Sequence, residues 1–129
     1  MAEESYPEEL KYHPEHDWAR IDGEEATFGI TWFAQDQLGE VVFFDPPEVG
    51  TQISAGSSYA EVESVKAVSD VIAPLSGEVL EVNGGLSDAP EKINDDPYDG
   101  GWLVRVKLTD PSEADSLLDV NAYRQLLSQ

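Results

Sequence analysis

The sequence predicts a mainly β protein, folded as an antiparallel sandwich or barrel. Its apolar segments are short, several alternate between apolar and polar residues, and turn residues separate them. The segment 25–30 shows this alternation clearly, because Ala26, Phe28 and Ile30 fall on one face. A chain of 129 residues with 40% hydrophobic residues suits one domain with a modest core.

The expected strands follow one another along most of the chain. They cover residues 18–21, 25–30, 40–44, 51–53, 58–64, 68–72, 78–82 and 102–108. A weak repeat suggests two similar halves, because GEVVF at Gly39 and GEVLEV at Gly77 are each followed by a strand that begins with an aromatic residue. Residues 1–11 are expected to form a flexible tail, which leaves 12–129 as the single domain.

Two helical stretches accompany these strands. Thr31 can cap a short helix that Gly39 stops. Near the C-terminus, Asp110 and Glu113 have the spacing of a capping box, and we expect the chain to continue as helix over 121–127. That last helix places three residues on one apolar face: Tyr123, Leu126 and Leu127.

The chain is strongly acidic. Its 27 Asp and Glu outnumber 7 Lys and Arg, which gives a formal net charge of −20. Such a surface repels nucleic acids and anionic lipids, so neither is an expected partner. It would be steered toward proteins with basic docking faces. The alternative is that the charge only keeps the protein in solution.

The sequence has no cysteine, which excludes a disulfide framework, a thiolate metal site and a cysteine nucleophile. Any redox chemistry would therefore come from an attached group. No apolar run approaches the roughly 18 residues of a membrane span. The acidic start MAEESYPEEL is unlike secretory or mitochondrial targeting segments. We expect a cytoplasmic protein, or a mature form whose targeting segment has been removed.

The stretch VESVKAVSDV, residues 62–71, mirrors itself about its centre. Mirror symmetry suits a β-hairpin, because partners across the two strands then match in size and polarity. The simplest register has a two-residue turn at Lys66 and Ala67, although neither favours the positive φ of the usual hairpin turns. It pairs four sets of residues: Val65 with Val68, Ser64 with Ser69, Glu63 with Asp70, and Val62 with Val71.

Lys66 would then sit at the tip of a protruding turn. An exposed lysine keeps a pKa near 10.4, which makes it a poor base and a poor nucleophile. It is better placed as an attachment point that another enzyme modifies. From the palindrome alone, an ordinary solvated lysine remains the simpler interpretation.

The hairpin and its surroundings resemble the glycine cleavage system H protein family. The hairpin segment AEVESVKAVSD, followed by APLSGEV, is similar to the lipoyl-attachment hairpin of that family. Further segments match in the same order: YHPEHDW (12–18), ATFGITWFAQDQLGEVVF (26–43), PPEVGTQISAG (46–56), NDDPYDGGWLVRVK (94–107) and the terminal DPSEADSLLD with AYRQLL. The resemblance covers residues 10–127, and six ordered segments are specific together.

The resemblance implies a barrel-sandwich hybrid, with a short helix after the first strands and a C-terminal helix. It also implies lipoate joined to Lys66 by an amide, so that the cofactor carries the redox and transfer chemistry. The chain would shuttle an aminomethyl group from a pyridoxal-phosphate glycine decarboxylase to a tetrahydrofolate-dependent aminomethyltransferase. A dihydrolipoyl dehydrogenase would reoxidise the dithiol, and a lipoate ligase or lipoyl transferase would attach it. The chain itself would be a non-catalytic carrier.

Five further residues gain roles from the resemblance. Glu63 and Gly77 match positions that the lipoylating enzyme reads, and Gly77 is also a plausible turn glycine. His16 and Asp17 match the pair near which the loaded arm docks, and Asp70 joins them there. An anionic Asp17 could pair with the protonated nitrogen of the cargo and shield it from water.

The residues around Lys66 do not favour biotin attachment. Biotin acceptors usually flank the lysine with methionines, and Met1 is the only methionine here. Lipoyl domains of 2-oxo acid dehydrogenase complexes lack the segment 94–102 and the terminal helix, but a lipoyl carrier or lipoate relay for those complexes stays open, as does an unmodified interaction module.

No metal site and no catalytic residue are expected. Pro14 separates His13 and His16, which does not suit helical ligand spacing. The acidic loop 94–101 lacks the flanking helices and the bidentate Glu of an EF-hand.

Overall fold

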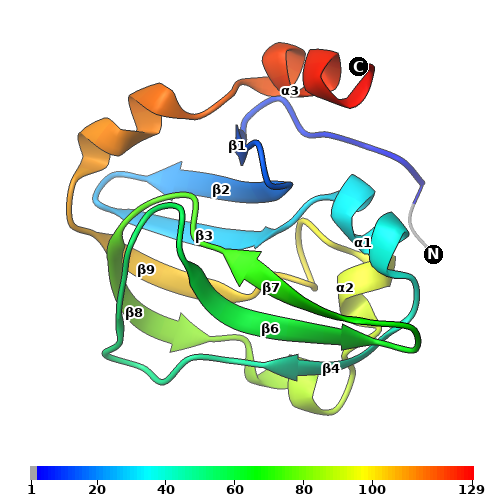
Figure 1. Ribbon diagram of the computed structural model, residues 1–129. Coiled ribbons are helices and arrows are strands. Elements are labelled where there is room, and N and C mark those ends of the chain that lie inside the picture. Colours follow the sequence, from blue (N-terminus) through cyan, green and yellow to red (C-terminus); the bar gives the residue numbers. More distant parts are fainter. Residues whose placement is uncertain (1–2) are drawn as a thin grey trace.

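The computed structural model describes residues 3–129, and its strands form two antiparallel sheets (Figure 1). One sheet has the order β1-β2-β3-β9-β8-β5, and the other has the order β4-β6-β7. The strands are β1 (Lys11–His13), β2 (Asp17–Asp22), β3 (Glu25–Ile30), β4 (Val41–Asp45), β5 (Gln52–Ile53), β6 (Ser58–Ser64), β7 (Val68–Ile72), β8 (Gly77–Val82) and β9 (Val104–Leu108). The expected sandwich of short antiparallel strands is confirmed.

The helices are short and lie at the ends and edges of the sandwich (Figure 1). They are α1 (Trp32–Leu38), α2 (Lys92–Asp95) and α3 (Val120–Leu127), with 3-10 helices at Gly84–Ser87 and Pro111–Ser116. None of the helices in residues 3–129 has the length and apolarity needed to cross a membrane.

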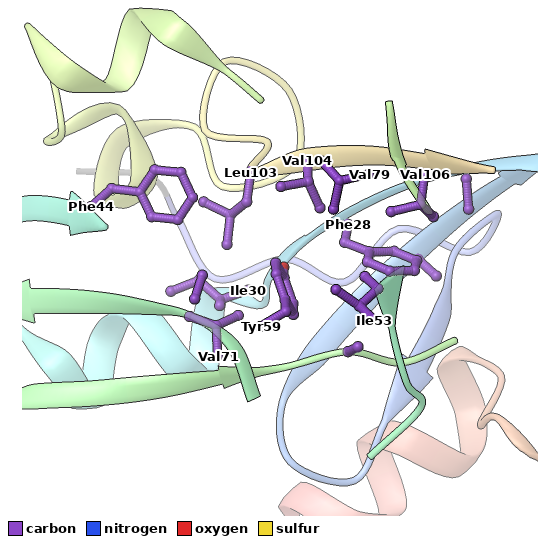
Figure 2. Packing of buried hydrophobic residues seen from close by; sticks show 14 of the residues in the cluster. Phe28, Ile30, Phe44, Ile53, Tyr59, Val71, Val79, Leu103, Val104 and Val106 are labelled. Carbon is purple, nitrogen blue, oxygen red and sulfur yellow. The ribbon is translucent and has the colours of Figure 1, made fainter. Parts of the chain in front are cut away.

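The main core fills the space between the two sheets. Figure 2 shows Phe28, Tyr59, Val71 and Val106 among the side chains that meet there, and all four are buried. They come from strands of both sheets, and alternate residues of each strand point inward. This burial is the main force that holds the two sheets together.

A second group of buried side chains covers the other face of β1, β2 and β3. We call this group the aromatic cluster: Tyr6, Leu10, Tyr12, Trp18, Tyr98, Val120 and Tyr123. Trp18 belongs to it while its neighbour Ala19 belongs to the main core, as the alternation of a strand requires. Gly29 pairs with Trp18 across the strands, and a Cβ at Gly29 would lie 2.5 Å from the indole ring.

The expectation of a flexible tail over 1–11 differs from the structure. Tyr6 is 5% exposed and Leu10 is 1% exposed, both within the aromatic cluster. The Tyr98 hydroxyl donates a hydrogen bond to the Ser5 carbonyl at 2.6 Å. The segment from residue 3 onward therefore packs on the domain, because partners far away in sequence bury its apolar side chains. Met1 and Ala2 lie outside the described residues.

Local capping signals predicted α1 correctly. The Thr31 hydroxyl accepts a hydrogen bond from the Ala34 amide at 3.2 Å, and Gly39 ends the helix with a φ of +83°. A positive φ at this position favours glycine.

The C-terminal region differs from the single helix that we expected. Asp110 caps a separate 3-10 helix through the Ser112 amide, and Asp119 caps α3 through the Ala122 amide. Leu118, between the two helices, exchanges backbone hydrogen bonds of 2.8 Å with Tyr12. Glu113 does not close the expected capping box, because its carboxylate binds Ser76 instead.

The expected strand over 102–108 begins later than predicted. Its ladder starts at Val104, because the Trp102 amide closes the preceding turn by donating to the Asp99 carbonyl at 3.1 Å.

Candidate functional site

Lys66 lies in the turn between β6 and β7, as the sequence predicts. The turn spans Ser64 to Ala67, and the Ser64 amide donates to the Ala67 carbonyl at 2.8 Å. The Ser64 hydroxyl accepts hydrogen bonds from the amides of Lys66 at 3.2 Å and Ala67 at 3.1 Å. One serine side chain thus satisfies two of the turn amides, and the Lys66 side chain is exposed.

The predicted register of this hairpin is wrong by two residues. In the structure Glu63 pairs with Val68, Val62 with Ser69, and Glu61 with Asp70. Glu63 and Asp70 are therefore not opposite each other. The four-residue turn avoids positive φ at Lys66 and Ala67, which neither residue favours. A shift of two residues keeps every side chain on its predicted face.

The Lys66 turn is fastened to the beginning of β4. The Val65 amide donates to the Glu40 carbonyl at 3.0 Å. The Lys66 side chain runs beside Gly39, where an added Cβ would lie 3.4 Å from the lysine Cε. The turn is therefore a positioned platform for the lysine.

A buried amide supports this platform from below. Asn94, in α2, accepts a hydrogen bond from the Val41 amide at 2.8 Å and donates to the Gly39 carbonyl at 2.8 Å and to Gln35 Oε1 at 2.9 Å. The sequence marked 94–101 only as an acidic loop. An isolated asparagine carries no local signal for such a long-range role.

A cleft of about 420 Å³ runs from this turn toward the beginning of β2. Apolar side chains from several elements form much of its lining, among them Ile30, Phe33, Leu38 and Val62. Four titratable residues also line the cleft: Glu15, His16, Asp17 and Asp70. The structure therefore brings together the three residues expected to dock an arm, and Ala67, next to Lys66, lies at the same cleft.

Asp17 is the most unusual carboxylate in the cleft. It is 2% exposed, and its Oδ2 has no hydrogen-bond partner among the described residues. Burial raises the pKa of this carboxyl well above its ordinary value; the Ile72 backbone hydrogen bond opposes the shift, and the charge of Glu15 adds to it. A buried oxygen without a partner fits a site that accepts a hydrogen bond from a bound group.

His16, the neighbour of Asp17, adopts a φ of +74°, which is uncommon for a residue other than glycine. Its Nδ1 lies 2.8 Å from the Tyr123 hydroxyl, and its ring centre lies 4.6 Å from that of Phe33. Burial lowers the pKa of the imidazole, against the opposing charge of Glu15. His16 is therefore favoured as a neutral group at neutral pH.

The two residues expected to be read by a lipoylating enzyme lie apart from each other. Glu63 is exposed and pairs with Phe43 on one side and Val68 on the other. Gly77 begins β8, at the end of the sandwich opposite the hairpin tip (Figure 1). Gly77 is buried, and a Cβ there would lie 2.4 Å from the Lys107 carbonyl oxygen, so packing alone requires glycine.

Within residues 3–129 no three His, Cys, Asp or Glu side chains are grouped so as to hold a metal ion. The acidic loop 94–101 is organised by its own backbone. The amides of Asp96 and Gly101 donate to the carbonyls of Lys92 and Asp96, respectively, at 2.8 Å and 2.7 Å.

A β-sandwich that presents a lysine on a fastened hairpin, beside a cleft that can receive an arm, defines a swinging-arm carrier. The chain belongs to the glycine cleavage H-protein family, whose model matches residues 10–129. A glycine cleavage system H protein of Symbiobacterium thermophilum is 52% identical over 117 residues, which cover 91% of each chain. One of Escherichia coli O7:K1 is 54% identical over 122 residues, or 94% of this chain and 95% of the other.

The fold agrees with a solved structure from the same family. The crystal structure of a glycine cleavage system H protein from Mycobacterium marinum superposes with a TM-score of 0.88 at 40% identity. It covers 96% of this chain and 100% of its own. The barrel-sandwich hybrid is thus confirmed, and the chain is a lipoyl carrier of the glycine cleavage system.

Proposed function

We propose that Lys66 is the residue that bears lipoate, through an amide on its Nζ. The observation that carries this proposal is the position of Lys66: an exposed lysine on a turn that Ser64 and Glu40 hold in place, at one end of a cleft. The chain itself would be non-catalytic. It would receive an aminomethyl group from a glycine decarboxylase and deliver it to an aminomethyltransferase.

The residues of the cleft fit such an arm. When bound, lipoate supplies a dithiol that carries the cargo and can be reoxidised by a dihydrolipoyl dehydrogenase. The apolar walls at Phe33, Leu38 and Val62 would cover its hydrocarbon chain and exclude water. Asp17, with its unpartnered buried oxygen, would accept a hydrogen bond from the protonated nitrogen of the cargo. That cation would favour the ionised carboxylate and lower its raised pKa.

Asp70 and His16 would complete the docking site. Asp70 lines the same cleft from the edge strand β7, so its charge would assist a cationic nitrogen that enters. His16 is adjacent to Asp17 and offers a neutral imidazole.

Glu63 and Gly77 remain our proposals for recognition by the lipoate ligase or lipoyl transferase. Glu63 is exposed close to the Lys66 turn and can be read directly. Glu63→Gln should slow lipoylation of Lys66, whereas Glu24→Gln, an exposed glutamate between β2 and β3, serves as the control. Equal rates for the two variants would remove Glu63 from the recognition site.

The surface around Lys66 supports docking by the partner enzymes. Four large apolar side chains near the turn are strongly exposed: Val42, Phe43, Val65 and Val68. Behind them a row of carboxylates crosses the sheet, because Asp45 pairs with Glu61 and Glu61 with Asp70. This pattern suits a partner with an apolar socket bordered by Lys and Arg.

The decisive experiment is intact mass measurement of the protein from its native host, followed by peptide mapping. One lipoyl increment on Lys66 is the expected result. A biotin increment would move the protein to carboxyl transfer. No modification, in a host that lipoylates its other carriers, would contradict the proposal. A lipoylated protein that fails to support glycine cleavage but serves 2-oxo acid dehydrogenases would favour a relay role.

Two broader points belong to the same proposal. Residues 12–129 would form a single carrier domain, onto which residues 3–11 pack. We propose a cytoplasmic location, which fractionation of the native host tests.

A further inference from the structure

We propose that Tyr123, on the C-terminal helix α3, is a positioning residue that fixes the His16 side chain in the wall of the cleft. The inference rests on the docking role proposed above for His16 and Asp17. Tyr123 is fully buried, and its hydroxyl lies 2.8 Å from His16 Nδ1 and 2.8 Å from Thr31 Oγ1. It therefore joins the C-terminal helix to the cleft and to the cap of α1.

The direction of these hydrogen bonds follows from the groups that can donate. The Thr31 hydroxyl oxygen accepts a hydrogen bond from the Ala34 amide. The same hydroxyl can donate its own hydrogen bond to the Tyr123 oxygen. The Tyr123 hydroxyl then donates a hydrogen bond to His16 Nδ1. With the His16 proton on Nδ1, either the buried Thr31 hydrogen or the buried Tyr123 hydrogen would be left without an acceptor among the described residues. The chain of donors therefore places the His16 proton on Nε2.

His16 needs such support because its backbone is held in an uncommon conformation. Two backbone hydrogen bonds maintain the φ of +74°: the His16 amide to the His13 carbonyl at 2.9 Å, and the Thr31 amide to the His16 carbonyl at 3.1 Å. These bonds fix the Cα but leave the imidazole free to rotate. Among the described residues, the Tyr123 hydroxyl is the group that hydrogen-bonds to the imidazole, and it therefore sets the ring orientation.

Ring contacts hold the Tyr123 side chain in place. The Tyr123 ring stacks on that of Tyr12, with ring centres 4.6 Å apart and an interplanar angle of 7°. The Tyr6 ring lies edge-on to it, with ring centres 5.5 Å apart. Asp119 caps the helix that carries it. The N-terminal segment and α3 thus act together to hold one hydrogen-bond donor against the cleft.

Tyr123→Phe tests the inference, and Tyr12→Phe is its matched control. Both changes keep an aromatic ring in the same stacked pair, but the Tyr12 hydroxyl donates to the Pro7 carbonyl and not toward the cleft. Nitrogen NMR of the imidazole in the full, lipoylated chain reads the tautomer and the pKa of His16. In wild type we expect the Nε2–H tautomer. In Tyr123→Phe we expect the pKa of His16 to rise, because a donor to the neutral ring is lost while the charge of Glu15 stays in place.

A second measurement is the half-life of the aminomethyl-loaded carrier in the absence of partner enzymes. Loss of one hydrogen bond should shorten it by about 2- to 10-fold in Tyr123→Phe and leave Tyr12→Phe unchanged. An Nδ1–H tautomer in wild type, which requires no variant, would overturn the inference. So would an unchanged His16 pKa in Tyr123→Phe.

Failure of the underlying docking proposal has a different signature. If Asp17→Asn and His16→Ala both leave the half-life unchanged, the arm does not depend on these residues. That result would contradict the docking role even where Tyr123→Phe alters the His16 spectrum.

Discussion

The Glu113 carboxylate holds Ser76 with both of its oxygens. Oε1 accepts a hydrogen bond from the Ser76 amide at 2.8 Å, and Oε2 accepts one from the Ser76 hydroxyl at 2.9 Å. The same hydroxyl accepts a hydrogen bond from the Ala55 amide at 2.9 Å. One side chain in the 3-10 helix after β9 therefore ties together the turns before β6 and before β8.

Glu113→Ala should lower the free energy of unfolding by about 1–3 kcal/mol, because hydrogen bonds to a charged group are lost and the partly buried Ser76 amide is left without its acceptor. Urea denaturation measures the change. Asp115→Ala, an exposed carboxylate in the same 3-10 helix, is the control and should change little. Equal effects in the two variants would show that the Glu113 contact adds nothing beyond surface charge.

Asn94→Leu should destabilise the platform beneath Lys66. The change leaves the Val41 amide and the Gly39 carbonyl without their partner, at a cost of about 2–4 kcal/mol. Amide hydrogen exchange should accelerate at Val41 beyond the change at the centre of β6. Asn121→Leu, on the exposed side of α3, provides the same substitution without buried partners. Unchanged exchange at Val41 would show that Asn94 does not hold the beginning of β4.

The sequence predicts correctly the elements that depend on interactions between residues close together in the chain. The strands at 25–30, 58–64 and 68–72 and the Thr31 cap were predicted correctly, because alternation and capping are local. The predicted register of the hairpin is wrong. The palindrome around Lys66 keeps the same faces in both registers, and the Ser64 side chain decides between them.

The remaining differences come from partners distant in sequence. Tyr6 and Leu10 are buried because α3 and Tyr98 lie beside them, and Glu113 binds Ser76 across the fold. At the site, the resemblance named His16, Asp17 and Asp70, which the structure brings to one cleft. The resemblance assigned no role to Asn94 or Tyr123. For Tyr123 the one signal was a hydroxyl on an otherwise apolar helix face.

Gly77→Ala separates the structural requirement for glycine from recognition. The new Cβ would meet the Lys107 carbonyl oxygen, so strands β8 and β9 must move apart, at about 1–3 kcal/mol of unfolding free energy. Gly84→Ala is the matched control, since nothing lies within 4 Å of its added Cβ. Thermal unfolding measures both variants. A folded Gly77→Ala protein that is lipoylated at the normal rate would show that Gly77 has only a packing role.

Asp17 should make stability depend on pH in a defined direction. Its pKa is raised in the folded protein, so between the unfolded value near 3.9 and the folded value the native state binds more protons. The contribution of Asp17 therefore falls as pH rises through this window and is constant above it. Unfolding free energies of wild type minus those of Asp17→Asn should show this fall. A difference that is flat or rises with pH would contradict the buried, unpaired state of this carboxyl.

Reversing the charge of the carboxylate row should weaken docking to the glycine decarboxylase. The double variant Asp45→Lys with Glu61→Lys reverses two of the three charges in the row behind the exposed apolar side chains, and it leaves Asp70, Lys66 and the cleft in place. We expect its association rate constant to fall by about tenfold at low salt, since electrostatic steering acts mainly on the rate of encounter. Stopped-flow measurements with the lipoylated carrier at low and high salt give this value.

The control is Asp22→Lys with Glu24→Lys, which changes the net charge equally. These two exposed acids lie at the β2–β3 turn, at the opposite end of the sandwich from the hairpin (Figure 1). A smaller effect there would mean that the position of the charges near Lys66 matters. Equal effects would assign the steering to net charge alone, because a distant partner then senses only the total field. Association that does not change with salt for any of the proteins would leave the acidic surface with a role in solubility only.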